Sequence, residues 1–153
     1  MATFSVRLNL RSIKMKTFQQ TISVNTLGRD TYNITRNIKQ IIQDSGIQTG
    51  LCNIFIKHTS ASLIISENAD PDVRHDLENF MKKIAPDGDR SYAHQDEGPD
   101  DMPAHIRTVL TQTALTIPVV KGQAGLGTWQ GVYCWEHRTH PHNRSLIVTV
   151  TGD

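Results

Sequence analysis

The spacing of apolar residues divides the first half of the chain into alternating strands and helices. Residues 18–24 alternate apolar and polar side chains, which is typical of a β-strand with one buried face. Isoleucines at positions 34, 38, 41 and 42 follow the helical period instead. We therefore expect a helix that is capped by Asp30 or Thr31 and ends at Gly46, with further strands over residues 51–57 and 61–66.

Two more helices are predicted in the second half of the chain. Asp70 followed by Pro71 is a preferred helix start, since aspartate caps the first turn and proline fits its first position. We expect the apolar stripe of this helix to face the core: Val73, Leu77, Phe80, Met81 and Ile84. A polar loop over residues 85–100 leads to a short third helix that begins at Asp101 or Met102. Its expected inward residues are Met102, Ile106, Val109 and Leu110.

Strands over residues 114–120, 128–136 and 146–151 complete the pattern. Strands interrupted by three helices and followed by more strands predict an α+β fold with a mostly antiparallel sheet. With 153 residues the chain is long enough to form a single compact domain around one core.

The first residues differ from the rest, because Arg7, Arg11, Lys14 and Lys16 lie within the first sixteen residues and the first acid is Asp30. We interpret residues 1–14 as a non-essential extension, either a small tail or an additional edge strand, and residues 15–153 as the domain. A transit peptide is the alternative interpretation of such an acid-free basic leader.

Composition narrows the function classes. A net charge of +1 lacks the basic excess of a nucleic-acid-binding protein, and no apolar run approaches the length of a membrane span. Both cysteines, Cys52 and Cys134, lie in apolar runs, which favours buried free thiols in a cytoplasmic protein.

Candidate chemistry first gathers in the stretch HQDEGPDDMPAH, in which His94 and His105 flank four acids. His105 would lie in the first turn of the third helix, at the edge of its apolar stripe, where a metal-ligating histidine could sit. The acids would then orient the imidazole rings. The alternative is a solvated loop whose acids cap a helix, and the wide histidine spacing by itself favours this alternative.

Two other stretches offer polar groups at strand ends. His58, Thr59 and Ser60 follow a predicted strand and either line a phosphate-binding pocket or form an ordinary polar turn. Gln130 and Glu136 share a strand face with apolar residues, and a carboxylate there needs a partner or a role.

The opposite face of that strand carries Trp129, Tyr133 and Trp135, a pattern typical of a core or a subunit interface. In the loop that follows, Arg138 or Arg144 could hold a phosphate through two parallel hydrogen bonds. A solvated connection between strands is the alternative for this loop.

Three motifs together resemble one known family. HTSASLIISENADPDVRHDLE, HQDEGPDDMPAHI and LTIPVVKGQAGLGTWQGVYCWEHR follow the order and spacing of the YjbQ-like proteins, often described as secondary thiamine-phosphate synthases. The resemblance covers roughly residues 15–152. It implies an α+β fold, a homotrimer, and a pocket near a subunit interface that binds a divalent metal and a small phosphorylated metabolite.

Carried over to this chain, the resemblance implies His58, His94 and His105 as metal ligands, with zinc favoured and magnesium as the alternative; Glu136 could replace His94. In the same pocket we expect Thr59, Ser60 and Thr128 at the phosphate groups, together with Arg144 from the loop described above, and Gln130 and Glu136 as catalytic residues. The implied reaction is a weak thiamine-phosphate synthesis that releases pyrophosphate. A metal-dependent hydrolase and a trimeric small-anion binding protein without enzyme activity remain alternatives.

Overall fold

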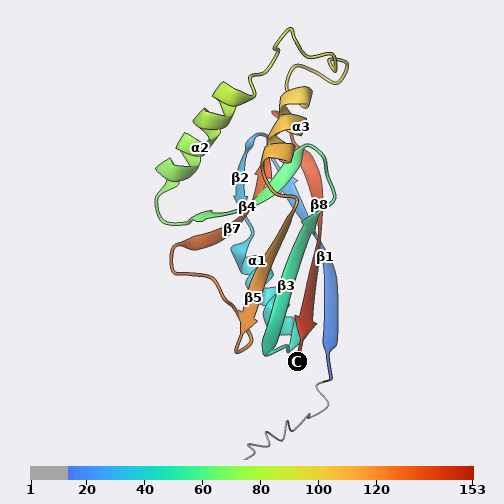
Figure 1. Ribbon diagram of the computed structural model, residues 1–153, viewed down its shortest axis with the longest axis vertical. Coiled ribbons are helices and arrows are strands. Elements are labelled where there is room, and N and C mark those ends of the chain that lie inside the picture. Colours follow the sequence, from blue (N-terminus) through green and yellow to red (C-terminus); the bar gives the residue numbers. More distant parts are fainter. Residues whose placement is uncertain (1–13) are drawn as a thin grey trace, which may run out of the picture.

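The computed structural model describes residues 14–153, which form two antiparallel sheets and three helices (Figure 1). The larger sheet has the strand order β1-β8-β3-β5-β6, and the smaller sheet has the order β2-β7-β4. All strand pairs are antiparallel. The predicted α+β class with a mostly antiparallel sheet is confirmed, whereas the prediction for residues 1–14 lies almost wholly outside the described residues.

The larger sheet is built on three long strands: β1 (Lys16–Thr26), β8 (His142–Gly152) and β3 (Thr49–Ile56). β5 (Ala114–Val120) and the two-residue β6 (Gln123–Ala124) complete one edge. β1 and β8 both extend beyond the predicted ranges, because they pair along their whole length, including their polar ends. β5 has the predicted bounds.

The smaller sheet contains one strand that the pattern did not predict. β2 (Asp30–Asn33) pairs with β7 (Gln130–Glu136), and β4 (Ala61–Glu67) pairs with the other edge of β7. The expected helix cap at Asp30 or Thr31 is therefore wrong, because both residues hydrogen-bond as a strand. α1 (Thr35–Ser45) begins after Ile34 and ends at Gly46, whose φ of 67° is the left-handed conformation predicted for it.

The core lies between α1 and the inner faces of both sheets. α1 contributes the predicted stripe of Ile38, Ile41 and Ile42, all buried. The inner sides of the sheets meet it; in β3 and β5 alternate residues are buried, whereas in β7 six consecutive residues are buried. The core positions of the strands are Cys52, Ile54, Ile56, Leu63, Leu115, Ile117, Val119, Val132, Cys134, Leu146, Val148 and Val150.

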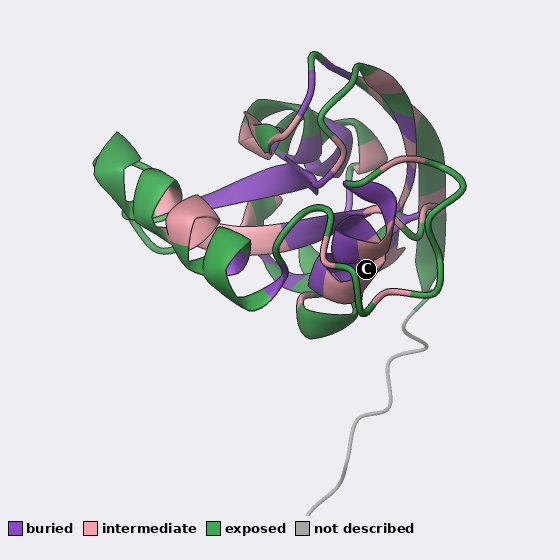
Figure 2. Ribbon diagram, turned by 90° about the horizontal axis from the view of Figure 1, so that it is seen from above, coloured by how far each residue is buried: buried purple, intermediate pink, exposed green. Residues whose placement is uncertain are grey.

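α2 (Pro71–Ile84) and α3 (Asp101–Leu110) do not bury the stripes predicted for them. α2 stands away from the sheets (Figures 1 and 2), and of its stripe only Met81 is buried. α3 turns its other face inward, so that Ala104 and Arg107 are buried while Val109 is 82% exposed. The start of α2 is as predicted, because the Asp70 side chain accepts a hydrogen bond from the Asp72 N–H at 2.9 Å.

No helix of the described residues is long and apolar enough to cross a membrane.

Candidate metal centre

Three potential metal ligands meet at the start of α3. The carboxylate of Asp101 is almost completely buried, and its Oδ2 atom lies 2.7 Å from His94 Nε2 and 3.2 Å from His105 Nε2. The two imidazole rings have their centroids 5.5 Å apart. One ligand atom from each residue lies within 4.8 Å of the others, a separation that suits a common metal ion.

The surroundings of His105 fix which of its nitrogens could bind a metal. Its Nδ1 atom lies 2.9 Å from the carbonyl oxygen of Thr59. A carbonyl only accepts hydrogen bonds, so Nδ1 carries a proton, and Nε2, which lies 3.2 Å from Asp101 Oδ2, is the ring nitrogen left for a metal. Metal-ligating histidines are commonly oriented in this way by a backbone carbonyl on the other ring nitrogen.

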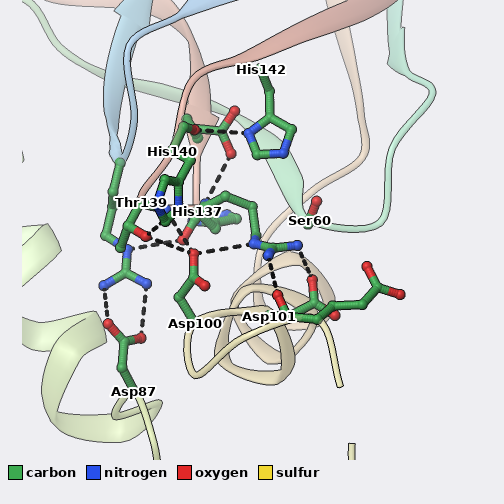
Figure 3. Close-up of polar contacts among 12 residues, drawn as sticks. Ser60, Asp87, Asp100, Asp101, His137, Thr139, His140 and His142 are labelled. Atoms are coloured by element: carbon green, nitrogen blue, oxygen red, sulfur yellow. Dashed lines mark hydrogen bonds and ion pairs between the residues drawn. The ribbon is translucent and has the colours of Figure 1, made fainter. Parts of the chain in front are cut away.

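Arg138 connects the candidate ligands to the rest of the molecule. Its guanidinium donates to Asp101 Oδ1, to Asp100 Oδ2 at 3.1 Å and to the carbonyl of Glu97 at 2.8 Å (Figure 3). The Asp101 carboxylate is thereby held with Oδ2 toward the histidines. The guanidinium of Arg138 thus binds carboxylates of the protein itself and is not free to hold a phosphate, which was one of the two functions considered for this residue.

Asp100 belongs to the same hydrogen-bond network, through its contact with Arg138. Asp100 precedes α3 but makes no side-chain cap hydrogen bond to it, and its carboxylate accepts the N–H and hydroxyl of Thr139 at 2.8 and 3.0 Å instead. Burial alone would raise the pKa of Asp100, but the hydrogen bonds from Thr139 and Arg138 outweigh it and lower that pKa to about 2. Asp100 is therefore a permanent anion that holds Arg138 in place.

His58 lies outside this cluster. Its Nε2 atom accepts a hydrogen bond from the Ser145 N–H at 2.8 Å, so the proton of the neutral ring is on Nδ1. Burial, and then the charge of Arg144, lower the pKa of His58 and favour this neutral form. The structure thus brings together His94 and His105 of the predicted ligand set, with Asp101 in the place expected for His58.

His58 nevertheless shares a cavity with His105. A hollow of about 470 Å³ is lined by both histidines and by Thr59, together with residues of α3 and the segment after it. A second hollow of about 570 Å³ adjoins it, and is lined by Phe55, His58, Thr59 and Ser60. The predicted phosphate-binding residues Thr59 and Ser60 therefore lie beside the candidate metal ligands.

Glu136 and Arg144 form a buried ion pair. Arg144 Nε donates to Glu136 Oε2 at 2.6 Å, and the same carboxylate accepts the Thr26 hydroxyl at 2.8 Å and the Arg138 N–H at 2.9 Å. Burial would raise the pKa of Glu136, but the hydrogen bond from Arg144 and the others lower it. Arg144 also donates to the Ser60 hydroxyl at 3.1 Å. This pair supports the cavity wall from within the protein, and neither side chain reaches the three-ligand cluster.

Thr128 and Gln130 lie at the far end of the smaller sheet. Gln130 is the first and Glu136 the last residue of β7, which places them about 20 Å apart along the strand. The Gln130 side chain accepts the Gly127 N–H at 2.8 Å. Within one chain the structure therefore does not bring these two predicted residues to the histidines.

His137 is a further buried histidine close to the network (Figure 3). Its Nε2 atom lies 2.8 Å from the Ser62 hydroxyl, and its ring packs on Trp135 at 5.2 Å between centroids. Burial, followed by the charges of Arg107, Arg29 and Arg144, lowers the pKa of His137 to about 3. His137 is therefore uncharged at neutral pH.

Sequence reasoning missed the ligand position of Asp101 and the connecting role of Arg138. One signal was available for the first, since Asp101 and His105 are four residues apart and so share a helix face. For Arg138 no local signal existed, because its partners are more than 35 positions away.

The chain is thus a small α+β protein with a candidate histidine- and carboxylate-lined site at the start of α3. The chain belongs to the UPF0047 YjbQ-like family, whose model matches residues 20–153. A UPF0047 protein from Synechocystis is 53% identical over 135 residues, which cover 88% of this chain and 92% of that protein. The UPF0047 protein YjbQ from Escherichia coli O157:H7 is 40% identical over 137 residues, with 89% and 99% coverage. Family membership, expected from the three motifs, is confirmed.

Solved structures show the same fold. A YbjQ-like protein of unknown function from Sulfolobus solfataricus P2 superposes with a TM-score of 0.84 at 26% identity, covering 92% of this chain and 100% of that one. An uncharacterized conserved protein of the YjbQ/UPF0047 family from Clostridium acetobutylicum has a TM-score of 0.79 at 34% identity, covering 86% and 98%.

Proposed function

We propose that this protein is an enzyme that uses a divalent metal, held by His94, Asp101 and His105, to act on a small phosphorylated metabolite. The observation that carries the proposal is the convergence of the three ligand atoms within 4.8 Å of one another beside a cavity. Three protein ligands leave a coordination position for water or substrate, as in catalytic sites.

The chemistry of the donor atoms favours zinc over magnesium. Two imidazole nitrogens and one carboxylate oxygen suit zinc, whereas magnesium prefers an all-oxygen site with several waters. A bound zinc ion would supply Lewis-acid stabilisation of a phosphate oxygen and a lowered pKa of a coordinated water.

The remaining residues support binding of the phosphate group. The Thr59 carbonyl fixes the tautomer of His105, and Arg138 fixes the orientation of Asp101. His58 keeps one ring donor, Nδ1–H, because its Nε2 atom already accepts a backbone hydrogen bond. That donor and the Thr59 hydroxyl, both in residues lining the cavity, could bind phosphate oxygens.

Two reactions fit this arrangement. The resemblance to the YjbQ-like family specifies thiamine-phosphate synthesis, in which a thiazole phosphate displaces pyrophosphate from a pyrimidine diphosphate. Hydrolysis of a phosphorylated metabolite is the second candidate. It is favoured by the single carboxylate among the ligands, because diphosphate-releasing sites usually hold their metals with several acids.

A product assay separates these reactions. The zinc-loaded protein is incubated with both thiamine precursors, and pyrophosphate is measured; parallel samples contain a panel of phosphorylated metabolites, and inorganic phosphate is measured. Pyrophosphate release that requires both precursors supports the transferase, and phosphate release that is lost in Asp101→Asn supports the hydrolase. Ligand binding without turnover of any substrate would overturn the enzyme proposal in favour of a small-anion binding protein.

A homotrimer is part of the proposal, and the outer side of the larger sheet supports it. The strand positions of this surface, here called the open face, carry no charged side chain, and the nearest is the exposed Lys57, which follows β3 beside Phe55. Phe55 is 44% exposed on it, and Leu51 and Val120 are each 54% exposed. Its other positions on the three inner strands are Thr49, Asn53, Ala114, Thr116, Pro118, Asn143, Ser145, Ile147, Thr149 and Thr151. A large uncharged surface with exposed apolar residues is typical of an interface between subunits.

The open face, rather than the aromatic side of β7, is the proposed interface. Tyr133 and Trp135 are 2% and 3% exposed, so of the two alternatives for that strand face they follow the core one. Two side chains of α2 contact them, since the Arg74 guanidinium lies 5.0 Å from the centre of the Tyr133 ring and Trp135 donates to Glu78 at 3.2 Å. Trp129, the third aromatic residue of the pattern, is 64% exposed. Phe55 lies both on the open face and in the wall of the cavity beside His58, so the site would lie next to a subunit interface. We place the protein in the cytoplasm, where its two buried cysteines would remain free thiols.

A further inference from the structure

The long loop that joins α2 to α3 is visible in Figure 1. Residues of this loop, among them the candidate ligand His94, line a cavity of its own. Its volume is about 260 Å³, and its walls include Arg90, Tyr92 and His94. His94 lines this cavity, whereas His105 lines the separate hollow that contains His58. The three-ligand cluster therefore lies between two cavities, and only one of them is used by the phosphate site proposed above.

This loop is held in shape by hydrogen bonds of its own. The Gly88 N–H donates to the Pro99 carbonyl at 2.9 Å and closes the neck of the loop. Inside the loop, the Gln95 side chain donates to the Tyr92 carbonyl, and the Tyr92 N–H donates to the Asp89 carbonyl at 3.2 Å. Arg138 ties the loop to Asp101 through the Glu97 carbonyl. The cavity therefore has a defined position relative to the metal ligands.

The chemistry of the walls suits a flat π-system. The Tyr92 ring is half-buried in the loop, and Arg90 is exposed and has no ion pair among residues 14–153. Tyrosine rings stack on other rings, and an unpaired guanidinium is attracted to a π face. The volume is sufficient as well, since a cavity of about 150 Å³ holds benzene.

We propose that this cavity binds the aromatic or heteroaromatic ring of a phosphorylated substrate whose phosphate lies at the metal site. The inference rests on the function proposed above and names the substrate class. The metal would bind to Nε2 of His94 while the body of the same imidazole forms part of the cavity wall. A ring joined to phosphate through one or two atoms would lie against Tyr92.

The test compares two phosphonates that the enzyme cannot hydrolyse, because their carbon–phosphorus bond replaces the ester. Benzylphosphonate, in which one carbon joins the phenyl ring to phosphorus, and methylphosphonate are titrated calorimetrically into the zinc-loaded protein. The phenyl compound should bind about tenfold more tightly, as expected for a stacked and buried ring. In Tyr92→Leu this advantage should disappear while methylphosphonate affinity stays within about twofold, and in Tyr92→Phe the advantage should remain.

The outcomes separate this inference from the proposed function. Equal affinity of both compounds for the wild type, or a full phenyl advantage in Tyr92→Leu, overturns the ring site and leaves the metal site standing. Failure of both compounds to bind protein that has taken up zinc overturns the phosphate site and the ring site together. Contacts in wild-type protein between the phenyl protons and the Tyr92 ring, measured by nuclear Overhauser effects, provide support that needs no variant.

Discussion

The buried histidine His137 should make the protein sensitive to mild acid. In the unfolded chain its pKa is close to the ordinary value of 6.5, whereas burial lowers its pKa in the folded chain to about 3. Below pH 6.5 the unfolded state therefore binds a proton that the folded state excludes. This contribution to stability is complete above pH 6.5 and is lost progressively as the pH falls toward 3.

The magnitude follows from the two pKa values. One unit of pH below the unfolded-state pKa corresponds to about 1.4 kcal/mol. Between pH 7.5 and pH 5, His137 alone should lower the free energy of unfolding by about 2 kcal/mol. His58, whose pKa is also lowered, acts in the same direction. Carboxylates contribute chiefly below this range, so the interval isolates the histidines.

The assay is urea unfolding of wild type and His137→Gln from pH 7.5 to pH 5, at one protein concentration and with chelator present. Glutamine can keep a hydrogen bond to Ser62 and does not titrate. The variant should lose about 2 kcal/mol less than the wild type over this range. His75→Gln, which changes an exposed side chain, should lose as much as the wild type. Equal losses in wild type and His137→Gln would refute the reasoning.

Four further predictions concern other parts of the structure. Asp100→Asn should lower the free energy of unfolding by about 2 kcal/mol at pH 7, because the lowered pKa of Asp100 reflects how much its charged form stabilises the folded state. Urea unfolding should show this difference from wild type shrinking as the pH falls from 4 to 2. Arg107→Met should cost on the order of 3 kcal/mol in the same assay, because it leaves Glu78 without its partner at 2.8 Å. Phe55→Glu should give monomers by light scattering, whereas Leu27→Glu, at a side chain that is 84% exposed away from the open face, should not. Removal of residues 1–14 should leave the melting temperature and the oligomeric state unchanged, and a drop of several degrees would show that the segment belongs to the domain.

The helix α1 and the strand β5 were predictable because their apolar residues face the core of the same chain. Ile38, Ile41 and Ile42 repeat at the helical period, and all three are buried. In α2 and α3 the same reasoning failed. The spacing of apolar residues does not tell whether a stripe faces the core of the same chain or is left exposed. Phe80 of α2 and Val109 of α3 belong to stripes of the exposed kind.

The candidate site was predictable in part for a related reason. His94 and His105 were identified because they flank an acidic stretch at the start of a predicted helix, and the structure brings them together. The buried face of α3 carries Asp101 and Arg107, which resemble solvent-exposed residues until their partners are known. Arg107 is fully buried and pairs with Glu78, 29 positions away. Such pairs depend on tertiary structure, so local sequence spacing does not indicate them.

The metal content of the purified protein tests the central claim most directly. Plasma mass spectrometry is applied to wild type, His105→Ala and Asp101→Asn after incubation with zinc and removal of free metal, with His75→Ala as the matched control outside the cluster. The account predicts close to one zinc ion per chain in wild type and in His75→Ala, and loss of zinc in both cluster variants while circular dichroism shows an intact fold. No zinc in the wild type, or equal zinc in all four proteins, would contradict a metal site formed by His94, Asp101 and His105.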